Sequence, residues 1–351
     1  MDDVELGTTG GPTGGPIGGL VDGFGRVATD LRVSLTDRCS LRCTYCMPAD
    51  GLPWLARDEL LTDDELVRLV DIATRLGVRR IRLTGGEPLI RPRIADLVGR
   101  LAALRPRPEL SMTTNGLALA RLAPALAEAG LDRVNVSLDT VDPVRFAELT
   151  RRDRHADVVA GLRAAADAGL TPVKVNSVLM RGVNDDEPVR LLAWCLDHGY
   201  QLRFIEQMPL DPQHGWDRAQ MLTGAEILAA LRTVYELTPV MARGNAPAET
   251  WQVVSGPGLL AGTTGTVGVI ASVTKPFCAD CDRLRLTADG QLRNCLFARD
   301  ESDLRTPLRA GAGDAELADR MRAAVAGKRR GHGIGDPDFR QPDRPMSAIG
   351  G

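Results

Sequence analysis

Between residues 31 and 205, short apolar stretches alternate with longer amphipathic ones. The short stretches are rich in Val, Ile and Leu and end in polar or glycine-containing turns, which is typical of buried strands. The expected strands are residues 31–35, 79–83, 109–113, 133–138, 172–179 and 201–205. The expected helices are residues 63–76, 93–104, 119–129, 158–168 and 187–197, and Thr62 with Glu65 forms a capping box at the first of them.

Six strand–helix units in succession predict a parallel sheet with right-handed crossovers. Six units are fewer than a closed eight-stranded barrel requires, so the expected fold is α/β, an incomplete (βα)6 barrel. After about residue 210 the pattern changes to a helix at 223–234, glycine-rich strands within 250–273, a hairpin around Ala288-Asp289-Gly290 and a helix at 316–326. We expect a disordered Gly-rich leader at 1–22, the barrel at 23–215 and a smaller α+β domain at 216–351.

Composition narrows the class of protein. Lys and Arg number 43 against 46 Asp and Glu, a net charge of -3, which argues against a strongly basic nucleic-acid-binding surface. No apolar run is long enough to span a membrane, and the N-terminus lacks the pattern of a secretory signal. We therefore expect a cytoplasmic protein with no nucleic-acid or membrane partner. Seven cysteines, an odd number, favour metal or redox chemistry over a disulfide framework.

The first cysteine cluster follows the first expected strand directly, as Cys39-x3-Cys43-x2-Cys46. Thiolates at these spacings can converge on one metal centre from a single loop. Three thiolates do not complete a tetrahedral zinc site, and the nearest further Cys or His is His155. A 4Fe-4S cluster with three protein ligands leaves one iron open to a small molecule. Structural zinc with a distant ligand is the alternative.

A second cysteine cluster comprises Cys278, Cys281 and Cys295, and we expect Cys195 to be a buried core thiol instead of a fourth ligand. Two incomplete centres suggest that one binds cofactor and the other binds substrate. Arg283 and Arg285 follow Cys281 and point to one face of a strand, where two guanidinium groups suit phosphates. The alternative is a pair of solvent-facing arginines in an arginine-rich chain.

Lysine is rare in this chain, which makes Lys174 informative. Only Lys174, Lys275 and Lys328 occur among the 43 basic residues. Lys174 lies between two valines in an expected strand, so its charge should face a solvated lumen or pair with an anion.

These motifs resemble known families. The CxxxCxxC spacing with Tyr45 before the third Cys, followed by Thr84-Gly85-Gly86-Glu87-Pro88, resembles the radical S-adenosylmethionine (SAM) superfamily. Within it, the chain from about Phe24 to the C-terminus resembles the GTP 3′,8-cyclase family of molybdenum cofactor biosynthesis. The matching stretches are residues 32–48, 82–88, 113–116, 136–139 and 204–209, the second cysteine cluster with its Arg-Leu-Arg, and the terminal Ile349-Gly350-Gly351.

The resemblance implies roles for particular residues. Cys39, Cys43 and Cys46 would hold a 4Fe-4S cluster that binds SAM, and Cys278, Cys281 and Cys295 a second 4Fe-4S cluster whose open iron meets guanine. The implied SAM contacts are Tyr45, Gly86, Ser137 and Met208. The implied GTP contacts are Arg32, Arg82, Thr113, Lys174, Arg283 and Arg285. Arg283, Arg285 and a tail ending in Gly350 and Gly351 that reaches into the active site are the implied catalytic residues.

The implied activity is that of a lyase. A 5′-deoxyadenosyl radical abstracts the ribose 3′ hydrogen of GTP, giving 3′,8-cyclo-7,8-dihydro-GTP in the first step of molybdenum cofactor biosynthesis. The implied partners are an electron donor such as flavodoxin or ferredoxin and a downstream cyclic pyranopterin monophosphate synthase. Two alternatives remain: a radical SAM enzyme that modifies a peptide or another small molecule with an auxiliary cluster, and a non-enzymatic zinc-binding scaffold. The sequence leaves open whether the chain forms a homodimer.

Overall fold

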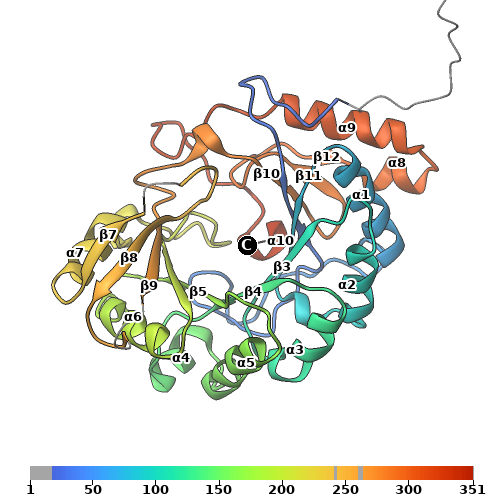
Figure 1. Ribbon diagram of the computed structural model, residues 1–351. Coiled ribbons are helices and arrows are strands. Elements are labelled where there is room, and N and C mark those ends of the chain that lie inside the picture. Colours follow the sequence, from blue (N-terminus) through green and yellow to red (C-terminus); the bar gives the residue numbers. More distant parts are fainter. Residues whose placement is uncertain (1–17, 241–242, 260–263, 351) are drawn as a thin grey trace, which may run out of the picture.

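The computed structural model describes residues 18–240, 243–259 and 264–350. Within these residues, twelve strands form one sheet in the order β12-β11-β10-β1-β2-β3-β4-β5-β6-β9-β8-β7. The central strands curve around the C-terminal segment, and helices cover the outer face (Figure 1). The architecture is therefore an open α/β barrel with its C-terminus inside.

The expected strand–helix units are confirmed, with small shifts at their ends. The strands are β1 (Asp30–Ser34), β2 (Arg80–Thr84), β3 (Glu109–Thr114), β4 (Arg133–Ser137), β5 (Lys174–Val178) and β6 (Gln201–Ile205). The helices are α1 (Asp63–Arg75), α2 (Ile94–Ala102), α3 (Leu119–Glu128), α5 (His155–Asp167) and α6 (Pro188–Asp197). The Thr62–Glu65 capping box is present, and Cys195 is fully buried in α6.

Among the helices between β1 and β6, α4 (Pro143–Thr150) was not predicted; the short helices α8 (Arg305–Arg309) and α10 (Met346–Ile349) were not predicted either. The Asp142 carboxylate caps α4 by accepting hydrogen bonds from the amides of Val144 and Arg145, and Pro143 occupies the first helical turn. Both features are helix-start signals that can be seen in the sequence.

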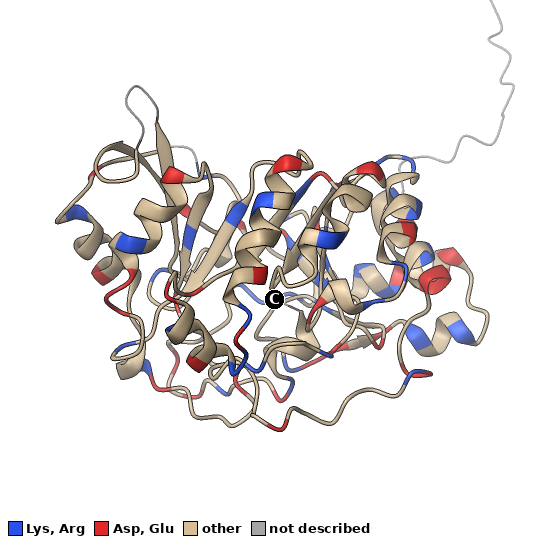
Figure 2. Cartoon of the chain, turned by 90° about the horizontal axis from the view of Figure 1, so that it is seen from below, with Lys and Arg blue, Asp and Glu red and all other residues tan. Residues whose placement is uncertain are grey.

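Alternation along the strands gives the sheet two different faces. Outward-facing Leu31, Val33, Ile81 and Leu83 are buried in the core under the helices. Inward-facing positions on the same strands carry polar or basic side chains, including Arg32 and Arg82. Figure 2 marks basic residues in blue along the strands as well as on the surrounding helices. The barrel therefore has an apolar outer wall and a polar, cationic lumen.

Strands from the C-terminal part complete both edges of the barrel. β10 (Arg283–Leu286) pairs parallel with β1, and β9 (Gly265–Ile270) pairs parallel with β6, so eight parallel strands lie side by side within the described residues. β11 (Gln291–Arg293) runs antiparallel to β10, which confirms the expected hairpin. The remaining strands and α-helices are β7 (Glu236–Pro239), β8 (Glu249–Ser255), β12 (Ser302–Asp303), α7 (Gly224–Arg232), α8 (Arg305–Arg309), α9 (Asp314–Ala326) and α10 (Met346–Ile349). The six-stranded barrel thus gains partners that cover its exposed edges, and a domain boundary at 215/216 stays a prediction.

The expected leader needs correction for residues 18–22. Leu20 is fully buried in the core, Val21 bridges to Val27, and the Asp22 carboxylate pairs with Arg26 at 2.6 Å. These contacts fix the segment despite its glycines. Residues 1–17 of the leader lie outside the described residues. None of the described helices combines the length and apolar character needed to cross a membrane.

Candidate active site

The two cysteine clusters lie at opposite ends of the same parallel strands. Cys281 comes just before β10, whose first residue, Arg283, pairs with Asp30 at the start of β1. Cys39 comes in the loop after the end of β1. All six cluster cysteines nevertheless line one cavity of about 320 Å³, because that cavity runs through the lumen between them. This volume is in the range of small-molecule sites.

The first triad, Cys39, Cys43 and Cys46, sits on a tight loop. The amides of Cys46 and Met47 both donate to the Cys43 carbonyl, at 2.9 and 3.0 Å. The Asn115 side-chain amide contacts the Cys39 sulfur at 3.8 Å. Burial raises the pKa of all three thiols, that of Cys46 to about 12. Such buried thiols ionise when a metal centre takes them as ligands.

The Gly85-Gly86 pair lets β2 end directly against this loop. The Gly86 amide donates to the Thr36 carbonyl at 2.7 Å, and a β-carbon at Gly86 would lie 2.2 Å from the Arg38 carbonyl oxygen. Gly85 has φ +142°, and a β-carbon there would lie 2.4 Å from the Thr36 carbonyl oxygen. Only glycines allow this approach, which fixes the segment leading into Cys39.

Asp139 is a site residue that the sequence prediction missed. The Tyr45 hydroxyl donates to its carboxylate at 2.7 Å, and the Val178 amide donates to the other oxygen at 2.8 Å. Burial raises the pKa of Asp139 to about 6. Ser137 at the end of β4 and Met208 beyond β6 line the same end of the cavity. Asp139 thus connects the loop that carries Cys39, Cys43 and Cys46 to the ends of β4 and β5 through hydrogen bonds.

The second triad has a cationic environment. Cys278 lies in a short 3-10 helix, η3 (Cys278–Asp280), and Cys295 follows β11. The Lys328 amino group is 3.5 Å from the Cys281 sulfur, and the Arg283 guanidinium lies 4.3 Å from the centre of the Phe277 ring. Burial alone would raise the pKa of the Cys281 thiol, but Arg283 and Lys328 lower it overall. The surroundings of Cys281 therefore favour the thiolate, whereas burial raises the pKa of Cys278.

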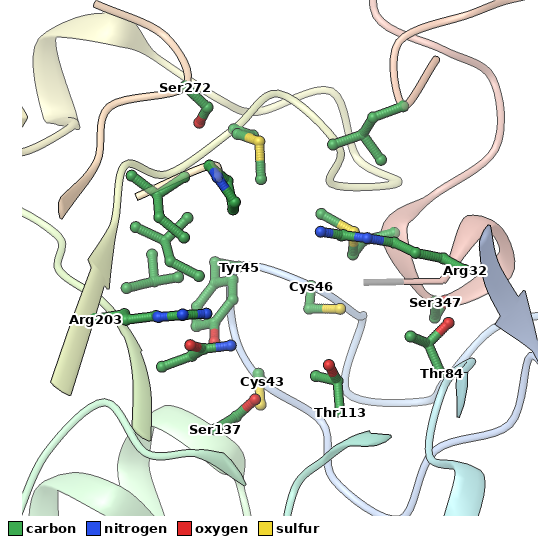
Figure 3. Close-up of a pocket in the computed structure, with 18 of the residues that line it drawn as sticks. Arg32, Cys43, Tyr45, Cys46, Thr84, Thr113, Ser137, Arg203, Ser272 and Ser347 are labelled. Carbon is green, nitrogen blue, oxygen red and sulfur yellow. The ribbon is translucent and has the colours of Figure 1, made fainter. Parts of the chain in front are cut away.

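Arginines line the walls between the two triads. Arg32 lies in register with Arg285 on one side and Arg82 on the other. Arg32 and Arg203 enter the cavity from opposite walls (Figure 3). Burial, with neighbouring arginines, lowers the pKa of Arg203 to about 10 and that of Arg285 to about 9. Clustered cations of this kind suit a polyanionic ligand. Arg203 was missed, although its inward position on β6 follows from strand alternation.

Among the expected GTP contacts, Lys174 stands apart from the cavity wall. Thr113 lines the cavity with the arginines, whereas Lys174 does not. It begins β5, in register with Asn135 and Gln201, on the same face as the cavity-lining Asn176. Burial, together with Arg203, Arg133 and Arg82, lowers the pKa of Lys174 to about 7. Lys174 therefore faces the lumen of the barrel next to the cavity, without lining it.

The C-terminal tail lies inside the barrel (Figure 1). The Gly350 carbonyl accepts a hydrogen bond from the Arg285 guanidinium. Gly350 has φ +88°, and a β-carbon there would lie 2.3 Å from the Ser34 hydroxyl oxygen and 2.4 Å from that of Thr84. Glycine is therefore required at this position. The expected catalytic residue Gly351 lies outside the described residues.

The donor set fits iron–sulfur clusters and a polar ligand. Each triad offers three soft thiols that suit a multinuclear cluster. Within the described part of the chain, no three His, Cys, Asp or Glu side chains are arranged to hold a single metal ion. Several buried polar atoms along the cavity also lack a hydrogen-bond partner among the described residues: Arg32 Nε, Thr84 Oγ1, Asn176 Oδ1, Ser272 Oγ, Arg283 Nη2 and Ser347 Oγ. Buried polar atoms normally have partners, so a polar ligand fits here.

Comparison with known proteins agrees with this geometry. Residues 33–195 match the Radical SAM superfamily, and residues 200–334 match the family Molybdenum Cofactor Synthesis C. GTP 3′,8-cyclase of Streptomyces coelicolor is 64% identical over 334 residues, covering 94% of this chain and 96% of the relative. GTP 3′,8-cyclase of Mycolicibacterium smegmatis is 59% identical over 347 residues, covering 98% and 95%. The chain belongs to the GTP 3′,8-cyclase family of the radical SAM superfamily.

Proposed function

We propose that this chain converts GTP to 3′,8-cyclo-7,8-dihydro-GTP, the first step of molybdenum cofactor biosynthesis. One observation carries the proposal: two triads of thiols face one cavity from opposite ends of the same strands, with arginines on the walls between them. A cofactor at one end and a substrate at the other would then share one enclosed space. The relatives named GTP 3′,8-cyclase support this assignment.

At the first triad, Cys39, Cys43 and Cys46 would hold a 4Fe-4S cluster with one iron open to SAM. Tyr45, Gly86, Ser137 and Met208 surround this end and would position the SAM molecule. When bound, this cofactor pair supplies a 5′-deoxyadenosyl radical that can take a hydrogen atom from the substrate. The Tyr45–Asp139 hydrogen bond keeps the loop rigid, so the protein contributes orientation.

At the second triad, Cys278, Cys281 and Cys295 would hold a second cluster beside the guanine. Arg283 and Arg285 project from β10 next to this triad, and Arg32, Arg82 and Thr113 continue the wall toward the first triad. Lys174 and Arg203 add charge on the far side of the lumen. Fixing the triphosphate from several strands holds the ribose in place, which can supply much of the catalytic advantage.

Conversion of GTP to the cyclised nucleotide removes one hydrogen atom from the ribose and adds one electron and one proton to the nucleotide. The ribose C3′–H bond breaks and its hydrogen ends on 5′-deoxyadenosine. A bond forms between C3′ and guanine C8, and N7 receives the proton as the electron enters. The product is therefore an isomer of GTP. An external one-electron donor, such as flavodoxin or ferredoxin, would supply the electrons, and a downstream synthase would convert the product to cyclic pyranopterin monophosphate.

Anaerobic incubation of the iron-loaded protein with GTP, SAM and dithionite tests the proposal. We expect liquid chromatography with mass detection to show a nucleotide with the mass of GTP but a different retention time, together with 5′-deoxyadenosine. Recovery of unchanged GTP alongside 5′-deoxyadenosine would instead favour a radical SAM enzyme that modifies a peptide or another small molecule. Lys174→Ala and Arg283→Ala should weaken GTP binding, and intact affinity in both variants contradicts the GTP assignment.

A further inference from the structure

Lys328, just beyond α9, is a buried lysine without a carboxylate partner. It is 5% exposed, and among the described residues it forms no ion pair with Asp or Glu. Its amino group donates to the Cys281 carbonyl at 2.9 Å, to the Arg283 carbonyl at 2.9 Å and to the Cys281 sulfur at 3.5 Å. These contacts use all three donors of the ammonium group. A buried charge needs an opposite charge, and the one acceptor here that can carry it is the Cys281 thiolate.

A second cation, Arg26, which pairs with Asp22 at 2.6 Å, contacts the backbone of the same triad. The Arg26 guanidinium donates to the Cys278 carbonyl at 2.5 Å and to the carbonyls of Arg329 and Arg330 at 2.6 and 3.0 Å. These contacts join Arg26 near the N-terminus, the loop at Cys278 and the segment that carries Lys328. The position of the Lys328 amino group relative to Cys281 is therefore held by a network and not by one flexible side chain.

The first triad also has a cation at its backbone, since the Arg42 guanidinium donates to the Cys39 carbonyl at 2.7 Å, but it has no cation that donates to a sulfur among the described residues. The buried carboxylates of Asp139 and Glu87 act on it, and its side-chain donor is the neutral amide of Asn115, 3.8 Å from the Cys39 sulfur. Among the described residues, no lysine or arginine donates to a sulfur of the first triad, whereas Lys328 donates to the sulfur of Cys281. The two triads thus differ in the charge of the side chain that donates to a ligand sulfur.

We propose that Lys328 is a positioning residue that fixes Cys281 and makes the iron–sulfur centre of the second triad easier to reduce than that of the first. The inference rests on the proposed function, because it assumes that both triads hold clusters. The reduction potential of such a centre depends on net charge and on hydrogen bonds to its sulfurs. A cationic donor beside a ligand sulfur stabilises the reduced, more negative state, so removing it lowers the potential.

The test is a redox titration of the iron-loaded full chain, followed by electron paramagnetic resonance without GTP or SAM. Lys328→Met removes the charge and the donor, whereas Lys328→Arg keeps both. We expect the second centre of Lys328→Met to have a lower midpoint potential, the first centre to be unchanged, and Lys328→Arg to stay closer to the unmodified protein. Repeating the titration in a Cys39→Ala background assigns the signal of the second centre.

Lys275→Met is the matched control, since Lys275 lies three residues before Cys278 but is exposed and pairs with the carboxylate of Glu249. Lys328→Met with full iron and sulfide content and an unchanged second potential overturns the proposal, as does an equal shift of both centres. If Lys328→Met does not bind iron, we expect Lys328→Arg to bind it. A Lys328→Arg variant that also fails to bind iron overturns the proposal. The potentials are measured without turnover. A protein that binds both clusters but does not cyclise GTP would therefore refute the proposed function and leave the proposal on Lys328 standing.

Discussion

Arg32 on β1 and Arg285 on β10 are direct neighbours in register, although their positions are about 250 residues apart in the sequence. Both side chains line the cavity, and Arg285 is 5% exposed. Two guanidinium groups held this close repel each other in a partly dry site, so the arrangement is costly unless an anion binds between them. The Gly350 carbonyl offers Arg285 only a neutral acceptor. We therefore expect the anionic triphosphate of GTP to bind beside this pair of arginines.

Arg285→Ala should weaken GTP binding by roughly 10- to 100-fold, the range expected when a hydrogen bond to a charged group is lost. Anaerobic calorimetry of the iron-loaded protein measures this affinity directly. Arg121→Ala, an exposed arginine on α3, is the matched control and should bind GTP normally. Equal affinities for the two variants would remove Arg285 from the binding wall.

Gly350→Ala should displace the tail from the lumen. An added β-carbon meets the hydroxyls of Ser34 and Thr84, and the backbone conformation there disfavours any side chain. We expect product formation to fall sharply while the thermal midpoint changes little, because the tail lies at the chain end. Gly335→Ala has open space around its β-carbon and serves as the control. Full activity of Gly350→Ala would mean that the tail has no part in the reaction.

The two triads should fail in different ways when one ligand is removed. Cys39→Ala should abolish cleavage of SAM, whereas Cys295→Ala should retain some uncoupled cleavage and lose the cyclised product. Counting 5′-deoxyadenosine and product in the same reaction distinguishes the two outcomes. Cys195→Ala controls for loss of a thiol in the core, and its iron content should be unchanged because Cys195 is buried in α6. Identical behaviour of the two ligand variants would contradict divided roles.

Lys174 should couple GTP binding to proton uptake. Its pKa is about 7 in the folded protein against 10.5 for the ordinary side chain, so above pH 7 the folded protein holds fewer protons than the unfolded chain. Stability of the free protein should therefore rise with pH between these values. A bound triphosphate favours the ammonium form, so GTP affinity should fall over the same range.

Calorimetry near pH 8 in two buffers of different ionisation enthalpy measures the protons taken up at Lys174. Lys174→Arg should bind GTP without this uptake, because arginine stays protonated. Proton uptake of the same size in both proteins would assign the linkage to a different group.

The local elements were predictable because their signals are local. The Thr62–Glu65 capping box and the alternation of Arg32 with apolar neighbours identify a helix and a strand before any contact is known. The joining of β9 and β10 to opposite edges of the barrel was not predictable, since pairing between distant strands leaves no periodic trace in the sequence. Leu20 was missed because a few apolar residues interrupted by glycines form no helix or strand period.

The site could be predicted where rare residue types carry the chemistry. The six cluster cysteines and the glycine pair have distinctive spacings, and the structure places all of them around one cavity. Arg203 and Asp139 are common types in a chain rich in both, so their positions had to come from the fold. Their roles, like those of the other site residues, stay predictions until they are measured.

Deuterium transfer tests the central claim most directly, namely that SAM and GTP share one cavity between the triads. The iron-loaded protein is incubated anaerobically with SAM, dithionite and GTP that carries deuterium at the ribose 3′ position, and 5′-deoxyadenosine is then examined by mass spectrometry. We predict that 5′-deoxyadenosine gains one deuterium as the cyclised nucleotide forms. Cyclised product together with unlabelled 5′-deoxyadenosine, or no product from GTP at all, would contradict the account.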